Sequence, residues 1–190
     1  MNNLEINQHL LNGELHLKGV LPHLEQLPNL KFLFDQDFGL RELPTEPGII
    51  TIRGPRQYGK STWLEQQIKI SIEKFGPGSA LYLNGDEIAD YHRLLTEIRN
   101  LINLFPTQTT IKRIFIDEIT AIDDWQRALK RLADAGEISD ILIITTGSKA
   151  IDLRHGIERL PGRKGKLERT NYIFTPISYS EFYAKCAHTF

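Results

Sequence analysis

The sequence has one cysteine, no long apolar run and almost no net charge, and each shortage excludes a class of protein. With Cys186 alone among 190 residues, no disulfide can form within the chain, and this usage is typical of a reducing compartment. No stretch approaches the roughly 18 apolar residues that a membrane span requires. Residues 1–5 lack the basic start and apolar centre of a secretory signal. We therefore expect a cytoplasmic protein without a membrane partner.

The near balance of charge also limits the choice of partners. A formal net charge of −1 argues against a protein that is basic throughout, although it leaves room for a local basic patch. Hydrophobic residues make up 41% of the chain and charged residues 25%, which is ordinary for a globular protein. The length suits one domain with appendages.

The most informative stretch is Gly-Pro-Arg-Gln-Tyr-Gly-Lys-Ser-Thr at residues 54–62. It has two glycines five residues apart, then a lysine, then a hydroxyl residue, which is the pattern of a phosphate-binding loop. A β-branched apolar run at 48–53 predicts a buried strand before it, and apolar residues at four-residue spacing in 61–75 predict a helix after it. The residues that we expect to bind the ligand here are Gly54, Pro55, Arg56, Gln57, Tyr58, Gly59, Lys60, Ser61 and Thr62.

The order strand, loop, helix explains these residue types. Glycines let backbone N–H groups curl around a polyphosphate, and the helix N-terminus adds its partial positive charge. Lys60 is expected to reach the β- and γ-phosphates, and the Ser61 hydroxyl to ligate Mg²⁺. The alternative is a chance turn between a strand and a helix, which the two flanking segments disfavour.

The rest of the chain alternates strands with helices. Further strands are expected at 80–84, 113–116, 140–146 and 172–174, and helices at about 89–105 and 123–135, the latter capped by Asp123 or Asp124. Such alternation predicts an α/β three-layer sandwich with a mostly parallel five-stranded sheet, helices on both faces, and ligands at the carboxyl ends of the strands.

The composition suggests three parts. Residues 1–45 are leucine-rich and form an extension that packs on the core, with Phe32, Phe34 and Phe38 as the expected anchors. Residues 46–175 form the phosphate-binding core. Residues 176–190 are expected to begin a C-terminal helical segment, with a helix starting at Ser178.

Polar residues at two expected strand ends narrow the chemistry. Asp117 can hold Mg²⁺ with Ser61, and Glu118 can orient a water for attack on the γ-phosphate. The alternative is that Glu118 merely opens the next helix, where acidic side chains are favoured. Thr146 and Ser148 can contact the γ-phosphate or the attacking water, or can instead cap a following helix; the sequence leaves both open.

A basic, glycine-containing run lies between Arg154 and Arg169. It can supply a cation to the transferring phosphate, in cis or from a neighbouring subunit, or it can be a solvated loop or a nucleic-acid contact. Guanine specificity is unsupported, because Asp152 lies one residue too far from Lys149 for a guanine-binding element and position 120 is threonine rather than glycine.

Five motifs together resemble a known group, the prokaryotic AAA-type ATPases also called archaeal-type or AAA-like. The motifs are the 54–62 loop, Ile-Asp-Glu at 116–118, Thr-Gly-Ser at 146–148, Leu-Pro-Gly-Arg at 160–163, and Pro-Ile-Ser-Tyr-Ser-Glu-Phe at 176–182. The resemblance covers roughly residues 48–183 and implies a P-loop NTPase core that binds ATP, a Walker-type acidic pair, and a catalytic arginine at Arg163. It further implies a C-terminal region beyond such a core.

The leading hypothesis is a Mg²⁺-dependent ATPase whose hydrolysis cycle switches a conformation, with Lys60, Glu118 and Arg163 in catalysis. A second is a non-catalytic module in which ATP orders the basic run for a protein or DNA partner. A third, a small-molecule kinase, is weaker because an Asp-Glu pair favours activation of water. A protein partner or self-association is expected, DNA is possible, and ATP is preferred to GTP by resemblance only.

Overall fold

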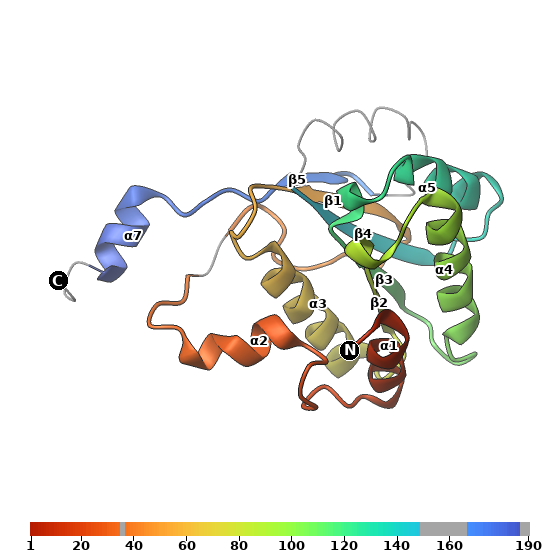
Figure 1. Ribbon diagram of the computed structural model, residues 1–190, viewed down its shortest axis with the longest axis horizontal. Coiled ribbons are helices and arrows are strands. Elements are labelled where there is room, and N and C mark those ends of the chain that lie inside the picture. The colour runs from red at the N-terminus through yellow and green to blue at the C-terminus, as the bar shows by residue number, and fades with distance from the viewer. Residues whose placement is uncertain (35–36, 149–166, 187–190) are drawn as a thin grey trace.

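The computed structural model of the chain describes residues 1–34, 37–148 and 167–186, which build a five-stranded sheet. All paired strands are parallel and the order across the sheet is β2-β3-β4-β1-β5. The expected α/β fold with a parallel sheet is confirmed (Figure 1). The strands are β1 (Gly48–Arg53), β2 (Ala80–Asn84), β3 (Lys112–Asp117), β4 (Ile141–Gly147) and β5 (Asn171–Ile173).

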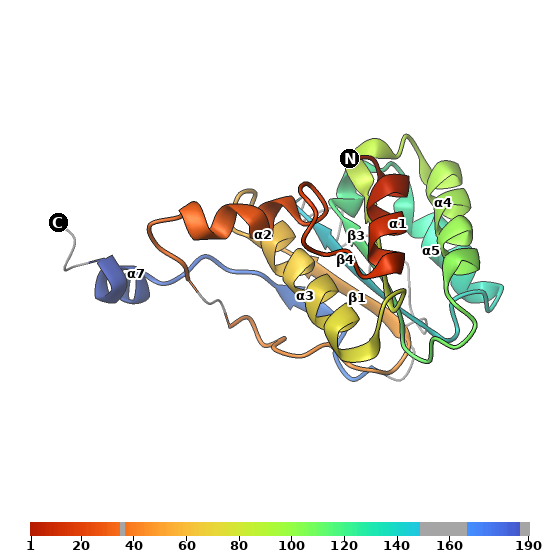
Figure 2. The ribbon, with the colours of Figure 1, turned by 90° about the horizontal axis from the view of Figure 1, so that it is seen from below.

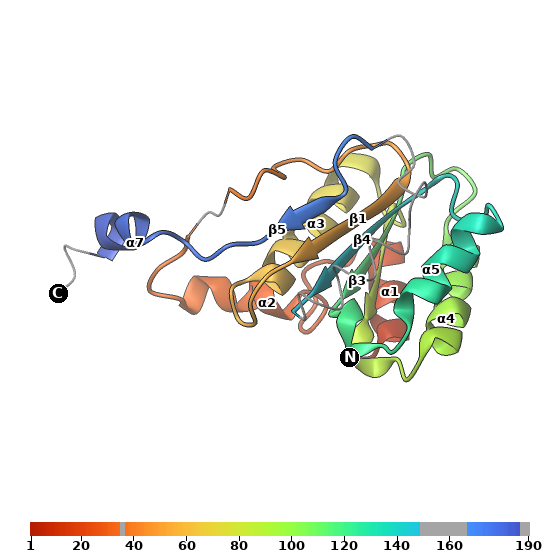
Figure 3. The ribbon, with the colours of Figure 1, turned by 90° about the horizontal axis from the view of Figure 1, so that it is seen from above.

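Helices cover both faces of this sheet. Figures 2 and 3 show α1 and α3 on one side and α4 and α5 on the other. None of the helices in the described ranges is long and apolar enough to cross a membrane. The helices are α1 (Asn3–Asn12), α2 (Pro22–Gln26), α3 (Lys60–Phe75), α4 (Tyr91–Leu104), α5 (Trp125–Asp134) and α7 (Tyr179–Cys186), with 3₁₀ turns at η1 (Leu27–Asn29), η2 (Gly85–Glu87) and η3 (Ile119–Ala121).

Alternating side chains of the central strands divide the core into two clusters. On β3, Ile114 and Ile116 join the cluster under α4 and α5, whereas Phe115 joins the cluster under α1 and α3. Every residue of β4 is buried. Because both faces are covered, these strands read as continuous apolar runs, which is why their sequences predicted them well.

Asparagines of α1 seal the exposed edge of the sheet. Asn7 is 1% exposed; its amide nitrogen donates to the Tyr82 carbonyl oxygen at 2.7 Å and its oxygen accepts from the Tyr82 N–H at 2.7 Å. Asn3 accepts from the Asn84 N–H at 2.7 Å in the same way. Asn3 and Asn7 are one helical turn apart and reach two alternate residues of β2. Their side-chain amides make the hydrogen bonds that a further strand would make at this edge.

The aromatic anchors of the N-terminal segment divide between two places. Phe38 is buried and packs against Trp63 and Phe174, with ring centroids 5.2 and 4.9 Å away. Phe34 instead stacks on Phe182 of α7 at 6.1 Å. The helix α7 lies away from the sheet (Figure 1), and Ser178 caps it by accepting from the Glu181 N–H at 3.2 Å.

We predict that the edge seal depends on Asn7. Asn7→Ala leaves the partly buried N–H and carbonyl of Tyr82 without these side-chain partners, so the free energy of unfolding should fall by about 1–3 kcal/mol. Asn7→Asp should be at least as damaging, because it loses both donors and places a carboxylate against carbonyl oxygens. Urea unfolding followed by circular dichroism measures both. Asn100→Ala, on the exposed side of α4, is the control and should change little; equal midpoints for Asn7→Ala and the parent would contradict the assignment.

Candidate functional site

The loop between β1 and α3 has two left-handed backbone positions and one close contact with the chain after β5. Gln57 (φ 63°) and Gly59 (φ 93°) are left-handed, a conformation that costs a non-glycine residue free energy. Nothing lies within 4 Å of a Cβ built on Gly59, so that side of the loop is open. A Cβ on Gly54 would lie 2.3 Å from the Phe174 carbonyl oxygen. Gly54 therefore allows close approach of the segment that follows β5, whereas Gly59 faces open space.

Lys60 begins α3 and is 4% exposed. Its Nζ donates to the carbonyl oxygens of Gly54 at 3.1 Å and Pro55 at 2.7 Å, and lies 3.7 Å from Glu118 Oε1. The ammonium group is thus held at the centre of the loop by two carbonyls and one carboxylate. A buried cation with partners that can be exchanged suits an anionic ligand.

Asp117 is the last residue of β3 and is 6% exposed. Its Oδ1 accepts from the Thr146 hydroxyl, at the end of the neighbouring strand β4, and from the Glu118 N–H at 3.1 Å. Its Oδ2 makes no hydrogen bond to the described residues. A carboxylate with one fixed and one open oxygen is the type of ligand that Mg²⁺ takes.

Thr146 connects the ends of β3 and β4. The sequence left open whether its hydroxyl contacts the γ-phosphate or caps a helix. In the structure the residue is fully buried, and its hydroxyl donates to Asp117 and accepts from the Glu118 N–H at 3.0 Å. It therefore helps to hold the two acidic residues in place.

Glu118 follows β3 in a left-handed conformation (φ 44°), which is strained for a side chain of this size. It precedes η3 but makes no capping hydrogen bond from its side chain. The carboxylate instead reaches across to the end of β4: Oε2 accepts from the N–H and the hydroxyl of Ser148, at 3.2 and 3.0 Å. Asp124 also sits before its helix, α5, without a side-chain cap, contrary to the expected capping role, and pairs with Arg127 at 3.1 Å.

The other expected site residues lie on the rim of the loop, in the first turn of α3, or outside the described residues. Arg56 lies on the exposed rim of the loop, and its Nε donates to the Ser148 hydroxyl at 3.3 Å. Pro55, Gln57 and Tyr58 are exposed on the same rim, and Ser61 and Thr62 are half-buried in the first turn of α3. Arg163, with the basic run from Arg154 to Lys166, lies outside the described residues. Arg169 is described and contacts the Tyr172 ring at 4.4 Å.

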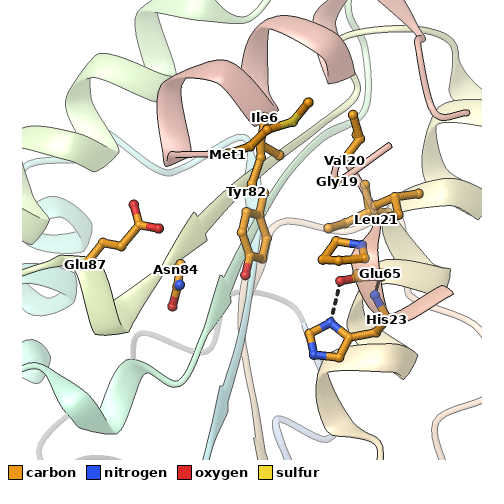
Figure 4. A pocket seen from close by; sticks show the side chains of 12 residues that line it. Met1, Ile6, Gly19, Val20, Leu21, His23, Glu65, Tyr82, Asn84 and Glu87 are labelled. Atoms are coloured by element: carbon orange, nitrogen blue, oxygen red, sulfur yellow. Dashed lines mark hydrogen bonds and ion pairs between the residues drawn. The ribbon is translucent and has the colours of Figure 1, made fainter. Parts of the chain in front are cut away.

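A pocket that the sequence did not predict lies beside this site (Figure 4). It has a volume of about 250 Å³ between the N-terminal segment, α3 and the end of β2. Val20, Leu21 and Ile68 form apolar walls, and the polar side holds Tyr82, Asn84, Glu87 and a His23–Glu65 pair. No sequence signal marked it, because its walls come from three separate segments: the N-terminal residues, α3 and the end of β2.

Glu65 of α3 fastens the N-terminal segment to the loop helix. Its carboxylate is 6% exposed and accepts from His23 Nδ1 at 2.6 Å and from the N–H groups of His23 and Leu24 at 2.9 and 3.0 Å. The hydrogen bond to Glu65 raises the pKa of His23, partly offset by burial, and the charge of Asp117 raises it further. Burial, and then the Asp117 charge, also raise the pKa of Tyr82. The pocket therefore lies within electrostatic reach of Asp117.

We predict a pH-dependent contribution of His23 to stability. Since its pKa in the folded protein lies above the unfolded value of about 6.5, the contribution is fully present below that value and is lost as pH rises through the folded pKa. The difference in unfolding free energy between parent and His23→Gln should be largest below about pH 6.5 and should shrink as the pH rises above that value. In the Glu65→Gln background the same substitution should show a much flatter pH dependence; an unchanged slope there would refute the pairing.

In the described part of the chain, no three histidine, cysteine, aspartate or glutamate side chains come together as a metal site. Oxygen ligands are nevertheless available at the open oxygen of Asp117 and at the Ser61 hydroxyl. Mg²⁺ is commonly held by one or two protein oxygens together with the phosphates of a nucleotide. The residues present therefore fit a metal that arrives with its nucleotide.

Comparisons with known proteins find one sequence relative and several similar folds. A 163-residue stretch is 27% identical to the uncharacterised protein MJ1544 of Methanocaldococcus jannaschii, covering 86% of this chain and 34% of that protein. The fold is similar to Orc1 of Aeropyrum pernix in complex with DNA (13% identity, TM-score 0.52, 92% of this chain and 52% of that one). It is also similar to Cdc6p of Pyrobaculum aerophilum (18% identity, TM-score 0.50, 89% and 49%).

The chain thus spans about a third of the curated relative and half of the solved structures. At identities this low the solved structures show the fold alone. The AAA domain family, however, matches residues 46–183, which is well over half of the chain and includes the loop, the acidic pair and the end of β4. The chain therefore belongs to the AAA domain family, and its α/β fold is that of a P-loop NTPase.

Proposed function

We propose that this chain is a Mg²⁺-dependent module that binds and hydrolyses ATP and changes conformation with its nucleotide state. One observation carries the proposal: Lys60 Nζ lies 3.7 Å from Glu118 Oε1, immediately beside Asp117, at the edge of the sheet where the loop opens. A phosphate-binding cation, a metal-binding carboxylate and a candidate base therefore share one small volume. The choice of ATP follows the family and is tested by titrating ATP against GTP.

The loop and α3 would bind the polyphosphate. The first N–H groups of a helix lack partners within the helix, and the helix dipole favours an anion there, so the start of α3 would receive the polyphosphate. Lys60 would exchange the Gly54 and Pro55 carbonyls for phosphate oxygens, with little movement of its buried stem. Ser61 and Asp117 would hold Mg²⁺, which neutralises charge on the β- and γ-phosphates.

Glu118 would position the attacking water. With Oε2 held by Ser148, Oε1 is the oxygen that remains to accept a hydrogen bond from water. The water oxygen would attack the γ-phosphorus while Glu118 accepts a proton from the water, the bond to the β,γ-bridging oxygen would break, and ADP would leave with the electron pair of that bond. Arg163 remains proposed by family resemblance as the cation that completes the site.

The second candidate is a nucleotide-gated binding module without turnover. The observation that favours it is α7, which presents Tyr179 and Tyr183 at 79% and 60% exposure and lies away from the sheet. Exposed aromatic side chains of this kind are typical of surfaces that contact a partner protein or a second copy. DNA is a further candidate partner, since the similar Orc1 structure contains it.

We predict that Lys60→Met weakens ATP binding about 10–100-fold, because a charge-assisted phosphate contact is lost. Isothermal titration with ATP and Mg²⁺ measures the change. Lys69→Met removes a surface lysine of the same helix, which pairs with Glu73 at 3.8 Å, and should bind as the parent does. Equal affinity of Lys60→Met and the parent would remove Lys60 from the site.

We predict that Glu118→Gln retains ATP binding and lowers phosphate release at least about 100-fold, because the amide is a poor base for the water. Steady-state release of labelled phosphate, with the products separated, also reveals any transfer to an acceptor other than water. Glu97→Gln on α4 controls for loss of a carboxylate. A parent protein that binds ATP tightly without releasing phosphate would favour the second candidate, and a Glu118→Gln protein as active as the parent would remove Glu118 from catalysis.

A further inference from the structure

We propose that Arg56, in the phosphate-binding loop, is a positioning residue for Glu118 and acts through the hydroxyl of Ser148. The inference rests on the proposed hydrolysis and adds a residue to it. Arg56 has an obvious simpler role, a direct contact with phosphate, and the structure argues for a different one.

The contacts form a chain across three segments. Arg56 Nε donates to the Ser148 hydroxyl at 3.3 Å, and that hydroxyl donates to Glu118 Oε2 at 3.0 Å. The three residues follow β1, β4 and β3, which are adjacent in the sheet in the order β3-β4-β1. The loop is thereby connected to the candidate base through the strand that lies between them.

The direction of these hydrogen bonds follows from a count of protons. A serine hydroxyl has one hydrogen and can rotate freely, whereas an arginine Nε can only donate. Once Arg56 occupies an acceptor site of the Ser148 oxygen, the single hydroxyl hydrogen is directed to Glu118. Without Arg56, the same hydroxyl can turn and donate to water.

The direction of the Ser148 hydroxyl determines which oxygen of Glu118 remains available to accept a hydrogen bond from water. Oε2 receives two donors from Ser148, while Oε1 lies 3.7 Å from Lys60 Nζ. A triphosphate that engages Lys60 would leave Oε1 facing the γ-phosphate, which is where a water must be held for in-line attack. Loss of the hydroxyl donor leaves Oε2 held by the Ser148 N–H alone, so the carboxylate can rotate more freely. Misplacement of a catalytic group by about 1 Å can cost up to ~100-fold in rate.

The two roles of Arg56 predict different kinetics. If Arg56 contacts phosphate directly, Arg56→Ala raises the dissociation constant for ATP and does so whether or not Ser148 is present. If it acts through Ser148, Arg56→Ala lowers kcat about 10–100-fold with affinity nearly unchanged, and Ser148→Ala does the same. The double variant should then be no slower than Ser148→Ala alone, because both substitutions break one chain.

The experiment measures kcat and ATP affinity for the parent, the two single variants and the double variant, with Ser148→Thr as the conservative control that keeps the hydroxyl. Millimolar guanidinium should partly restore kcat of Arg56→Ala and leave the double variant unchanged. Independent, multiplying losses in the double variant, or a loss of affinity alone, would overturn the proposal.

A readout without turnover separates this inference from the proposed hydrolysis. In ¹⁵N-labelled protein, the Arg56 Nε–H signal should shift in Ser148→Ala and remain in place in Ser148→Thr, since only the former removes its acceptor. A parent that binds ATP but releases no phosphate would refute the hydrolysis. If the Arg56 Nε–H signal does not shift in Ser148→Ala, the proposed series of hydrogen bonds from Arg56 to Glu118 is refuted, whatever the ATPase activity.

Discussion

A buried ammonium group sets the geometry on which this site depends. The Lys60 side chain is 3% exposed, and an unpaired charge at that depth would cost several kcal/mol. The loop meets that demand by turning two carbonyls inward, and Glu118, the residue after β3, adds a carboxylate whose Oε1 lies 3.7 Å from the ammonium nitrogen. The loop therefore curls around its own lysine, with the carbonyl oxygens of Gly54 and Pro55 turned toward the ammonium group. The cation shapes the cradle before any ligand enters it.

The N-terminal segment belongs to this architecture more closely than its composition indicates. It seals the β2 edge through Asn3 and Asn7 and is fastened to α3 by Glu65, five residues after Lys60. Its His23 also responds to the charge of Asp117. The helix α3 is thus held by the N-terminal segment on one side and by the sheet on the other. A shift of this segment would reach the loop through α3, because packed helices transmit displacement rather than absorb it.

Apolar runs and apolar spacing in the sequence predicted most of the core strands and helices. The continuous apolar runs gave β1 to β4 within a residue or two because those strands are covered on both faces, and apolar spacing gave α3 and α4. The roles of Thr146 and Asn7 were invisible for the opposite reason. Each makes hydrogen bonds to residues 28 to 75 positions away, and neither pattern nor propensity encodes such partners. Asp124 shows the remaining limit, since a residue suited to capping occupies the position before its helix without making the hydrogen bond.

The strain at Glu118 is explained by the number of groups that hold it. A left-handed glutamate persists only where its surroundings over-determine it. Here the backbone N–H donates to Asp117 and Thr146, and the carboxylate meets Ser148 and Lys60. Of these partners, only Lys60 would exchange its contact with Glu118 for a phosphate, because only Lys60 is positively charged. The contacts from β3 and β4 would remain. A ligand would therefore change the loop and its lysine, while the acidic pair keeps the position that the neighbouring strand has set.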